Sequence, residues 1–157
     1  MNIQLVAIGK TDNKALQALI DEYVKRLSFY IKFDITIIQD LKNSKNLSEI
    51  QQKEKEGELI LSKIVSTDYL ILLDENGKTF SSVGFSNELQ KKMNAGLKTL
   101  VFVIGGPYGF SESVYLRANS KLSLSLMTFS HQMVRLFFIE QVYRSFTILK
   151  NEPYHHQ

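Results

Sequence analysis

The segment Gly105–Gly109 (GGPYG) has residue types that could serve a ligand directly. It follows an apolar run, Leu100–Ile104, that has the character of a buried strand. Glycine has no Cβ and adopts positive φ readily, so backbone N–H and C=O groups in such a loop can reach the polar edge of a ligand. Gly and Pro are also the usual residues of tight turns. From these residues alone, a ligand-binding loop and a simple turn both remain open.

Charged side chains inside the apolar segment His131–Leu149 are a second candidate for chemistry. Glu140 and Arg144 are four residues apart, so they can pair on one face of a helix. Arg135 lies in the same segment. Buried charges need a partner and otherwise cost stability. The spacing is compatible with an ion pair that sets the register of a subunit interface, and equally with a functional pair beside a ligand loop.

Other catalytic motifs are incomplete or missing. Gly77-Lys78-Thr79 matches the end of a Walker A loop, but Leu72 stands where that motif needs its first glycine. The glycine loop lacks the G-x-G-x-x-G spacing of a dinucleotide fold, and no G-x-S-x-G elbow of a serine hydrolase occurs. The three histidines have no fitting spacing and the chain has no cysteine, so no metal site is predicted.

Alternation of strands and helices then predicts the elements that must position these residues. The expected strands are Ile3–Ile8, Phe33–Ile38, Tyr69–Leu73, Leu100–Ile104 and Leu122–Leu126, and the expected helices are Asp12–Tyr30, Leu47–Val65, Asn87–Met93, Ser111–Asn119 and His131–Leu149. A turn is expected at Glu75-Asn76-Gly77, and Ser48 is a candidate N-cap. Strands that are apolar on both faces indicate an α/β domain, residues 1–157, with a mostly parallel sheet flanked by helices. In such a sheet, ligands sit beyond the carboxyl ends of the strands, where the glycine loop lies.

Composition places few limits on function. The chain has 157 residues, 44% of them hydrophobic and 22% charged, as in ordinary globular proteins. A net charge of +3 permits a polyanionic partner without requiring one. We find no signal peptide and no apolar run long enough to span a bilayer, and the lack of cysteine fits a reducing compartment. We therefore expect a cytoplasmic protein that does not bind membranes.

The segment His131–Leu149 also carries apolar side chains around its whole circumference. A helix of that kind should be buried on every side. Because the last helix of a small domain lies outside the sheet, we expect a second copy of the chain to cover it, with Phe138 in the interface. The sequence thus predicts a homodimer.

Several segments, taken in order, resemble one known family. They are LLDENGK at Leu72–Lys78, VIGGPYGF at Val103–Phe110, LSLSLMTFSHQMVRLFFIEQVYRSFTI at Leu122–Ile148 and the ending NEPYHHQ, and the opening LVAIGK and KEGE at Lys55–Glu58 are also similar. The resemblance is to the SPOUT-class methyltransferases that methylate N3 of a pseudouridine in helix 69 of 23S ribosomal RNA. It extends over the whole chain.

This resemblance implies properties that composition and periodicity do not. It implies an α/β fold whose C-terminal part is threaded into a deep trefoil knot, which sequence rules alone would not propose. It implies a homodimer, S-adenosyl-L-methionine as cofactor, no metal, and 23S rRNA within the ribosome as partner. The cofactor-binding residues that it implies are Leu73, Gly105, Gly106, Ser125, Leu126, Met127, Thr128, Phe129 and Ser130. The Pro-Tyr-His ending resembles the family's tail, which approaches the active site of the dimer.

The implied reaction suggests roles for the remaining residues. Methyl transfer from a sulfonium is an in-line displacement, so the enzyme mainly positions donor and acceptor. A pseudouridine N3 must lose its proton to attack well, and it needs a base or a cation that stabilises the anion. Arg144 is the candidate for the anion or an RNA phosphate. His131 and Glu140 are candidate proton acceptors, and Tyr154 and His155 are candidate contacts to the base.

Two other functions remain open at this point. A SPOUT enzyme that methylates a ribose 2′-hydroxyl of transfer RNA would use the same cofactor loops without deprotonating an imide. A non-catalytic nucleotide-binding or ribosome-binding α/β module would not need the cofactor at all. Cofactor binding distinguishes the module from the enzymes, and the position of the methylated nucleotide distinguishes the two enzymes.

Overall fold

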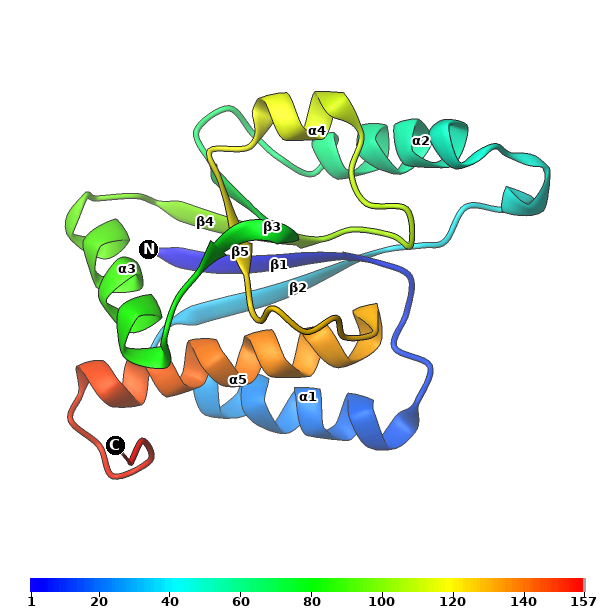
Figure 1. The fold of residues 1–157 in the computed structure, drawn as a ribbon. Helices are drawn as coiled ribbons and strands as arrows, with labels where there is room; N and C mark the ends of the chain where they lie inside the picture. The colour runs from blue at the N-terminus through cyan, green and yellow to red at the C-terminus, as the bar shows by residue number, and fades with distance from the viewer. Residues whose placement is uncertain (157) are drawn as a thin grey trace.

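A computed structural model describes residues 1–156 and shows a parallel sheet with helices on both faces (Figure 1). The strands are β1 (Asn2–Ile8), β2 (Lys32–Ile38), β3 (Tyr69–Thr79), β4 (Thr99–Ile104) and β5 (Ser120–Ser123). The helices are α1 (Lys14–Leu27), α2 (Glu49–Leu61), α3 (Ser82–Asn94), α4 (Glu112–Arg117) and α5 (His131–Leu149), with a 3-10 turn at Ser44–Asn46. The predicted α/β class is confirmed.

The five strands run in the order β2-β1-β4-β3-β5, and every pairing is parallel. Alternate residues of β1 and β4 point to opposite faces, so Leu5 and Phe102 enter one core while Val6 and Val103 enter the other. The first core lies under α1, α3 and α5, and the second under α2 and α4 (Figure 1). Strands covered on both faces explain the continuous apolar runs of the sequence.

Local signals set several helix ends. Ser48 caps α2 in a capping box with Gln51, as predicted. Asn13, for which the sequence predicts no role, caps α1 by accepting from the amide of Leu16. α5 begins and ends at the predicted residues. The predicted helices over 12–30 and 47–65 extend a few residues too far at both ends, and the last strand ends at Ser123 instead of Leu126.

The predicted turn at Glu75-Asn76-Gly77 is wrong. β3 continues to Thr79, with an irregularity between Leu73 and Lys78 where its pairing with β5 shifts register. A Cβ on Gly77 would stand 2.5 Å from the carbonyl carbon of Leu122, so the glycine lets β3 lie directly on the backbone of β5. A sequence that is common in turns is here an irregular strand, because a neighbouring strand pairs with it.

Helix α5 is covered mostly within its own chain. It packs against α1 and α3 and lies on the sheet (Figure 1). Phe138 is 0% exposed, and its ring centroid lies 4.5 Å from that of Phe102 in β4. The prediction that Phe138 lies in a subunit interface is therefore wrong. Met133 and Phe137 are the large apolar side chains of α5 that remain exposed, at 38% and 37%.

Among residues 1–156, no helix is both long enough and apolar enough to cross a membrane.

Candidate functional site

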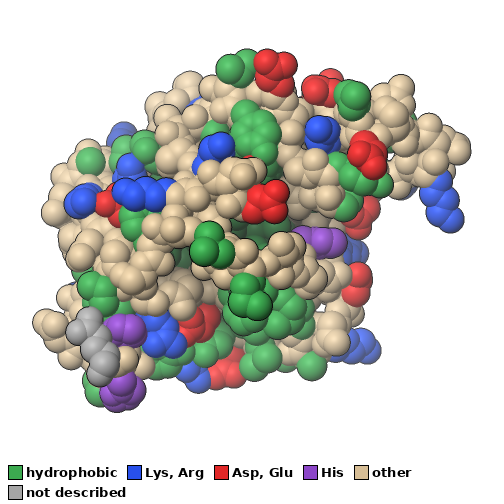
Figure 2. Space-filling model, viewed as in Figure 1, with side chains coloured by type: hydrophobic (Ala, Val, Ile, Leu, Met, Phe, Trp, Pro, Cys, Tyr) green, Lys and Arg blue, Asp and Glu red, His purple; other side chains and the backbone are tan. Residues whose placement is uncertain are grey.

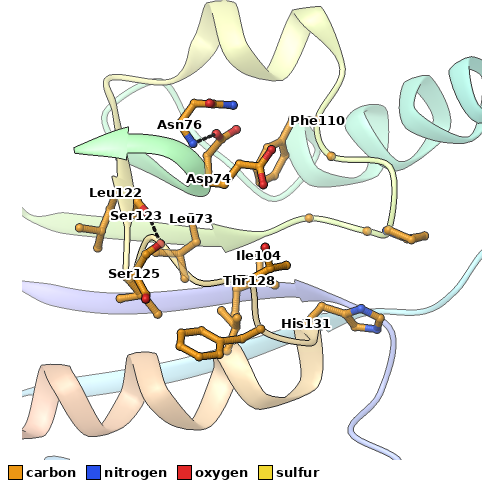
Figure 3. A pocket seen from close by; sticks show the side chains of 18 of the residues that line it. Leu73, Asp74, Asn76, Ile104, Phe110, Leu122, Ser123, Ser125, Thr128 and His131 are labelled. Carbon is orange, nitrogen blue, oxygen red and sulfur yellow. Dashed lines mark hydrogen bonds between the residues drawn. The ribbon is translucent and has the colours of Figure 1, made fainter. Parts of the chain in front are cut away.

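A cavity of about 480 Å³ opens at the carboxyl ends of β4 and β5 and beside the middle of β3, where the apolar part of that strand ends (Figure 3). In the close-up, Asp74 and Asn76 lie on the β3 side, while Thr128 and His131 lie on the α5 side. The cavity is lined by residues 73–76, 104–110, 122–125 and 127–129, together with Tyr115, His131 and Val134. Its position agrees with the general rule that ligands of parallel sheets bind beyond the carboxyl ends of the strands.

The glycine loop forms one wall of the cavity, and its glycines serve different needs. Gly109 has φ +81°, and its amide donates to the carbonyl of Gly106 at 3.2 Å. A Cβ on Gly105 would stand 3.0 Å from the ring of Phe110. A Cβ on Gly106 would stand 2.3 Å from Oε2 of Glu56 in α2. The loop is thus a turn and a cavity wall at once, and the space vacated at Gly106 is taken up by a buried carboxyl group.

Asp74 provides a carboxylate at the end of the apolar part of β3. Its Oδ2 accepts from the hydroxyl of Tyr115 at 2.5 Å, and its Oδ1 accepts from the amide of Asn76 at 2.8 Å (Figure 3). Burial, with a smaller contribution from the hydrogen bond to Asp74, raises the pKa of Tyr115 to about 12. Asp74 is therefore held in place at the cavity wall, where it can accept hydrogen bonds from ligand hydroxyl or ammonium groups.

The segment between β5 and α5 closes the cavity on the opposite side. Ser123 donates to the carbonyl of Ser125 at 2.9 Å, and the Ser125 hydroxyl accepts from the amide of Met127 at 2.9 Å. Of the residues predicted here to bind cofactor, Ser125, Met127, Thr128 and Phe129 line the cavity, as do Leu73, Gly105 and Gly106. Leu126 is 95% exposed and does not line it, and Ser130 instead caps α5 by accepting from the amide of Met133.

Four of the predicted catalytic residues form a separate cluster at the far end of α5. The Arg144 guanidinium donates to Oε1 of Glu140 at 2.5 and 3.0 Å, and it lies 4.7 Å above the ring of Tyr154. The hydroxyl of Tyr154 donates to the same oxygen at 3.0 Å, and Arg144 lies 3.3 Å from Nδ1 of His155. We name Glu140, Arg144, Tyr154 and His155 the tail cluster.

The tail cluster is held by charge and by burial. The hydrogen bond to Glu140 raises the pKa of Arg144, so its guanidinium is permanently charged. Burial is the main cause of a raised pKa at Tyr154, followed by hydrogen bonds with Tyr23 and Glu140, so this hydroxyl stays protonated at neutral pH. The tail itself is tied to the turn that follows α1, since Tyr30 in that turn donates a hydrogen bond to Glu152.

His131 is not part of the tail cluster. It stands at the cavity, at the start of α5, and 13 residues separate it from Arg144, or roughly 20 Å at 1.5 Å per helical residue. Figure 2 shows histidine side chains in two separate places, beside the start of α5 and beside the C-terminus. The structure therefore brings together seven of the nine predicted cofactor residues and His131, and separately the tail cluster, but it does not join the two groups within one chain.

Comparison with known proteins identifies the family. A family model described as a predicted SPOUT methyltransferase matches residues 1–155. The chain belongs to the SPOUT methyltransferases. It is 82% identical to a protein of Flavobacterium johnsoniae and 80% identical to one of Flavobacterium psychrophilum, in both cases over 157 residues and the whole of each chain. A protein of Christiangramia forsetii is 69% identical over the same length, and all three are named ribosomal RNA large subunit methyltransferase H.

Two polar residues of this SPOUT methyltransferase have roles that the sequence does not predict. The signal for Asp74 is an acid directly after an apolar strand in LLDENGK, within the segment for which a turn is predicted. The sequence indicates no role for Arg135, and in the structure Arg135 donates to the carbonyl of Ile8 at 2.7 Å and to the hydroxyl of Thr11 at 3.0 Å. Arg135 thereby joins α5 to the end of β1, and burial lowers its pKa.

Within residues 1–156, the structure contains no group of three or more His, Cys, Asp or Glu side chains arranged to hold a metal ion.

Proposed function

We propose that this protein transfers a methyl group from S-adenosyl-L-methionine to N3 of a pseudouridine in helix 69 of 23S ribosomal RNA, on the assembled ribosome in the cytoplasm. The observation that carries the proposal is the cavity of about 480 Å³, whose walls are three segments of the kind that the family resemblance assigns to the cofactor. Relatives of the same length that are named as ribosomal RNA large subunit methyltransferases support the class of substrate.

The residues of the cavity fit this cofactor. Its volume lies within the range of about 300–1,000 Å³ that is usual for small-molecule sites. Apolar side chains such as Ile104 and Leu122 suit an adenine ring, and backbone groups of the glycine loop suit its polar edge. Asp74 provides acceptors for hydroxyl or ammonium groups. The bound cofactor would supply an electrophilic methyl group on a positively charged sulfur.

We further propose that the active site is completed by a second copy of the chain. Exposed apolar side chains gather near the start of α5 (Figure 2), and they are Leu126, Met127, Met133 and Phe137. A two-fold interface through this surface would bury it in both copies. The tail cluster of one copy would then approach the cavity of the other. A site shared between two copies would thus join groups that lie roughly 20 Å apart along α5 within one chain.

In such a composite site each predicted residue has a role that its chemistry suits. Arg144 stabilises the uracil anion or holds an RNA phosphate. His131, at the cavity, or Glu140 accepts the N3 proton. Tyr154 and His155 contact the target base. Because Tyr154 stays protonated, it contributes a hydrogen-bond donor and not a base.

We also propose the deep trefoil knot that is typical of the family. β5 lies at the edge of the sheet beside β3, while α5, which follows it after a short segment, packs between α1 and α3 against the first core. The chain thus passes from the edge of the sheet back to its centre, and this path supports the proposal that the C-terminal part is threaded into a knot. Very slow, multiphasic refolding of the denatured chain would agree with it, whereas a single fast phase would argue against it.

The test is incubation with S-adenosylmethionine labelled in its methyl group and ribosomes that lack the modification, followed by nucleoside analysis. The proposal expects one labelled N3-methylpseudouridine per ribosome, and no label in free transfer RNA. Label on a transfer-RNA ribose would indicate the related 2′-O-methyltransferase instead. Absence of cofactor binding in calorimetry would indicate a non-catalytic module and refute the proposal.

A further inference from the structure

The segment KEGE at Lys55–Glu58 in α2 is the sequence feature to which the proposed function gives no role. Glu56 is only 3% exposed, and Gly57 is buried beside it, whereas Glu54 and Glu58 of the same helix are exposed. A carboxyl group is rarely buried unless it is paired. Burial of Glu56 is therefore a feature to be explained, and the contacts of the dipeptide Glu56-Gly57 give the explanation.

Glu56 lies directly behind the glycine loop. Its Oε1 accepts from Nε2 of Gln52 at 2.9 Å, and its Oε2 has no hydrogen-bond partner within residues 1–156. That Oε2 stands 2.3 Å from the position that a Cβ of Gly106 would occupy. The backbone of Gly106 is thus in close contact with the carboxyl group on one side and lines the cavity on the other.

Gly57 makes the matching contact at the other end of the same loop. A Cβ there would stand 2.2 Å from Oγ of Ser111 and 3.3 Å from the side chain of Val114. Only glycine allows α2 to approach the start of α4 this closely. Two consecutive residues of α2 therefore contact both ends of the loop Gly106–Ser111.

The energetic cost of this arrangement indicates that it serves more than packing. A buried polar atom without a partner lowers the stability of the fold, and an apolar side chain of similar volume would avoid that loss. Burial raises the pKa of Glu56, so the group tends toward its neutral form. A costly group in contact with the wall of a ligand site is often retained for that site.

We propose that Glu56 is a positioning residue that holds the loop Gly106–Ser111 in the conformation that receives the cofactor. The identity of the cofactor rests on the proposed function, whereas the contact with the loop does not. Glu56 acts through the backbone of Gly106 and touches neither cofactor nor substrate. A glutamine has the same shape and can replace its neutral form, but an aspartate is one methylene too short to reach Gly106.

The experiment measures the loop and the cofactor separately in four variants. Amide hydrogen exchange of residues 105–111 is recorded without ligand, and calorimetry measures binding of S-adenosylmethionine. The variants are Glu56→Ala, Glu56→Asp and Glu56→Gln, with Glu58→Gln as the matched exposed control on the same helix. Global stability is followed by Tm.

Glu56→Ala and Glu56→Asp should speed exchange locally at residues 105–111 and weaken cofactor binding on the order of tenfold or more, since the loop must then be ordered on binding. Glu56→Gln should restore both properties, and Glu58→Gln should match the wild type. If Glu56→Ala does not fold, Glu56→Asp decides.

Folded Glu56→Asp protein with wild-type exchange and affinity would overturn the proposal, and so would a Glu56→Gln variant as impaired as Glu56→Asp. If the wild type binds no S-adenosylmethionine while the loop still loosens in Glu56→Asp, the proposed function fails and the positioning role stands.

Discussion

Replacing Arg144 by alanine separates a role in methyl transfer from a role in stability. In the structure, Arg144 and Glu140 form an ion pair whose side chains are 25% and 17% exposed. Exposed pairs contribute about 0–1 kcal/mol, and breaking a buried pair costs about 3–5 kcal/mol. For this half-buried pair we expect a loss of about 1–3 kcal/mol, which lowers Tm by roughly 3–9 °C in a chain of this size.

The effect on catalysis should be larger than the effect on stability. If Arg144 stabilises charge on the target base or its phosphate, its removal should slow methyl transfer on the order of 10²-fold or more. Cofactor affinity should stay the same, because Arg144 lies outside the residues that line the cavity. Transfer to ribosomes, calorimetry with S-adenosylmethionine and Tm should be measured on one preparation, below the temperature at which the variant begins to unfold.

A matched control exists in α1. Arg26 and Glu22 form an exposed ion pair with the same spacing of four residues, and Arg26 also lies over aromatic rings. Arg26→Ala should change Tm by less than Arg144→Ala and leave transfer near the wild-type rate. If Arg144→Ala loses several degrees of Tm but keeps near-normal activity at low temperature, Arg144 is only a structural partner of Glu140 and does not belong to the active site.

Four further predictions follow from burial, close contacts and titration. Phe138→Ala should lower the free energy of unfolding in urea by about 3–5 kcal/mol, and an unchanged free energy of unfolding would contradict the burial of Phe138 in the core. Phe137→Asp should leave the protomer folded and shift sedimentation toward the monomer, and an unchanged dimer would show that Phe137 lies outside the interface. Gly106→Val should abolish cofactor binding and also lower Tm, because the Cβ of the valine would stand 2.3 Å from the carboxyl group of Glu56. A normal Tm together with lost binding would show that the loop shifts away from Glu56 at no cost to stability, and would contradict the predicted clash. Hydrogen bonding to Glu152 is the main reason that the pKa of Tyr30 is raised to about 12, so its contribution to stability should persist below about pH 10 and disappear as the pH rises toward 12; Tyr30→Phe should flatten the alkaline stability curve, and an unchanged curve would refute this contribution.

Much of the architecture could be predicted from local sequence patterns. Runs such as Leu100–Ile104 are apolar on both faces, and only a parallel sheet covered on both sides accommodates them. Ser48 and the bounds of α5 were likewise readable, because capping depends on residues within one turn. The pairing of Glu140 with Arg144 follows from helix geometry in the same way.

The errors arose where a distant part of the chain supplies the partner. The segment Glu75–Gly77 has turn residues, yet β5 pairs with β3 beyond it and keeps it extended. The apolar circumference of α5 predicts that Phe138 lies in an interface, but Phe102 and the neighbouring helices cover Phe138 within the chain. A local hydrophobic pattern predicts that a face of a helix is buried, but it does not indicate which other residues cover that face.

The sequence by itself therefore determined the class of fold, the glycine loop, the ion pair of α5 and the resemblance to SPOUT methyltransferases, since these depend on residue type and short spacing. Only the tertiary structure decided that Asp74 faces the cavity and that Gly106 makes room for Glu56. Each of these facts depends on contacts between segments tens of residues apart. Such contacts are set by how the helices pack on the sheet, which no short stretch of sequence encodes.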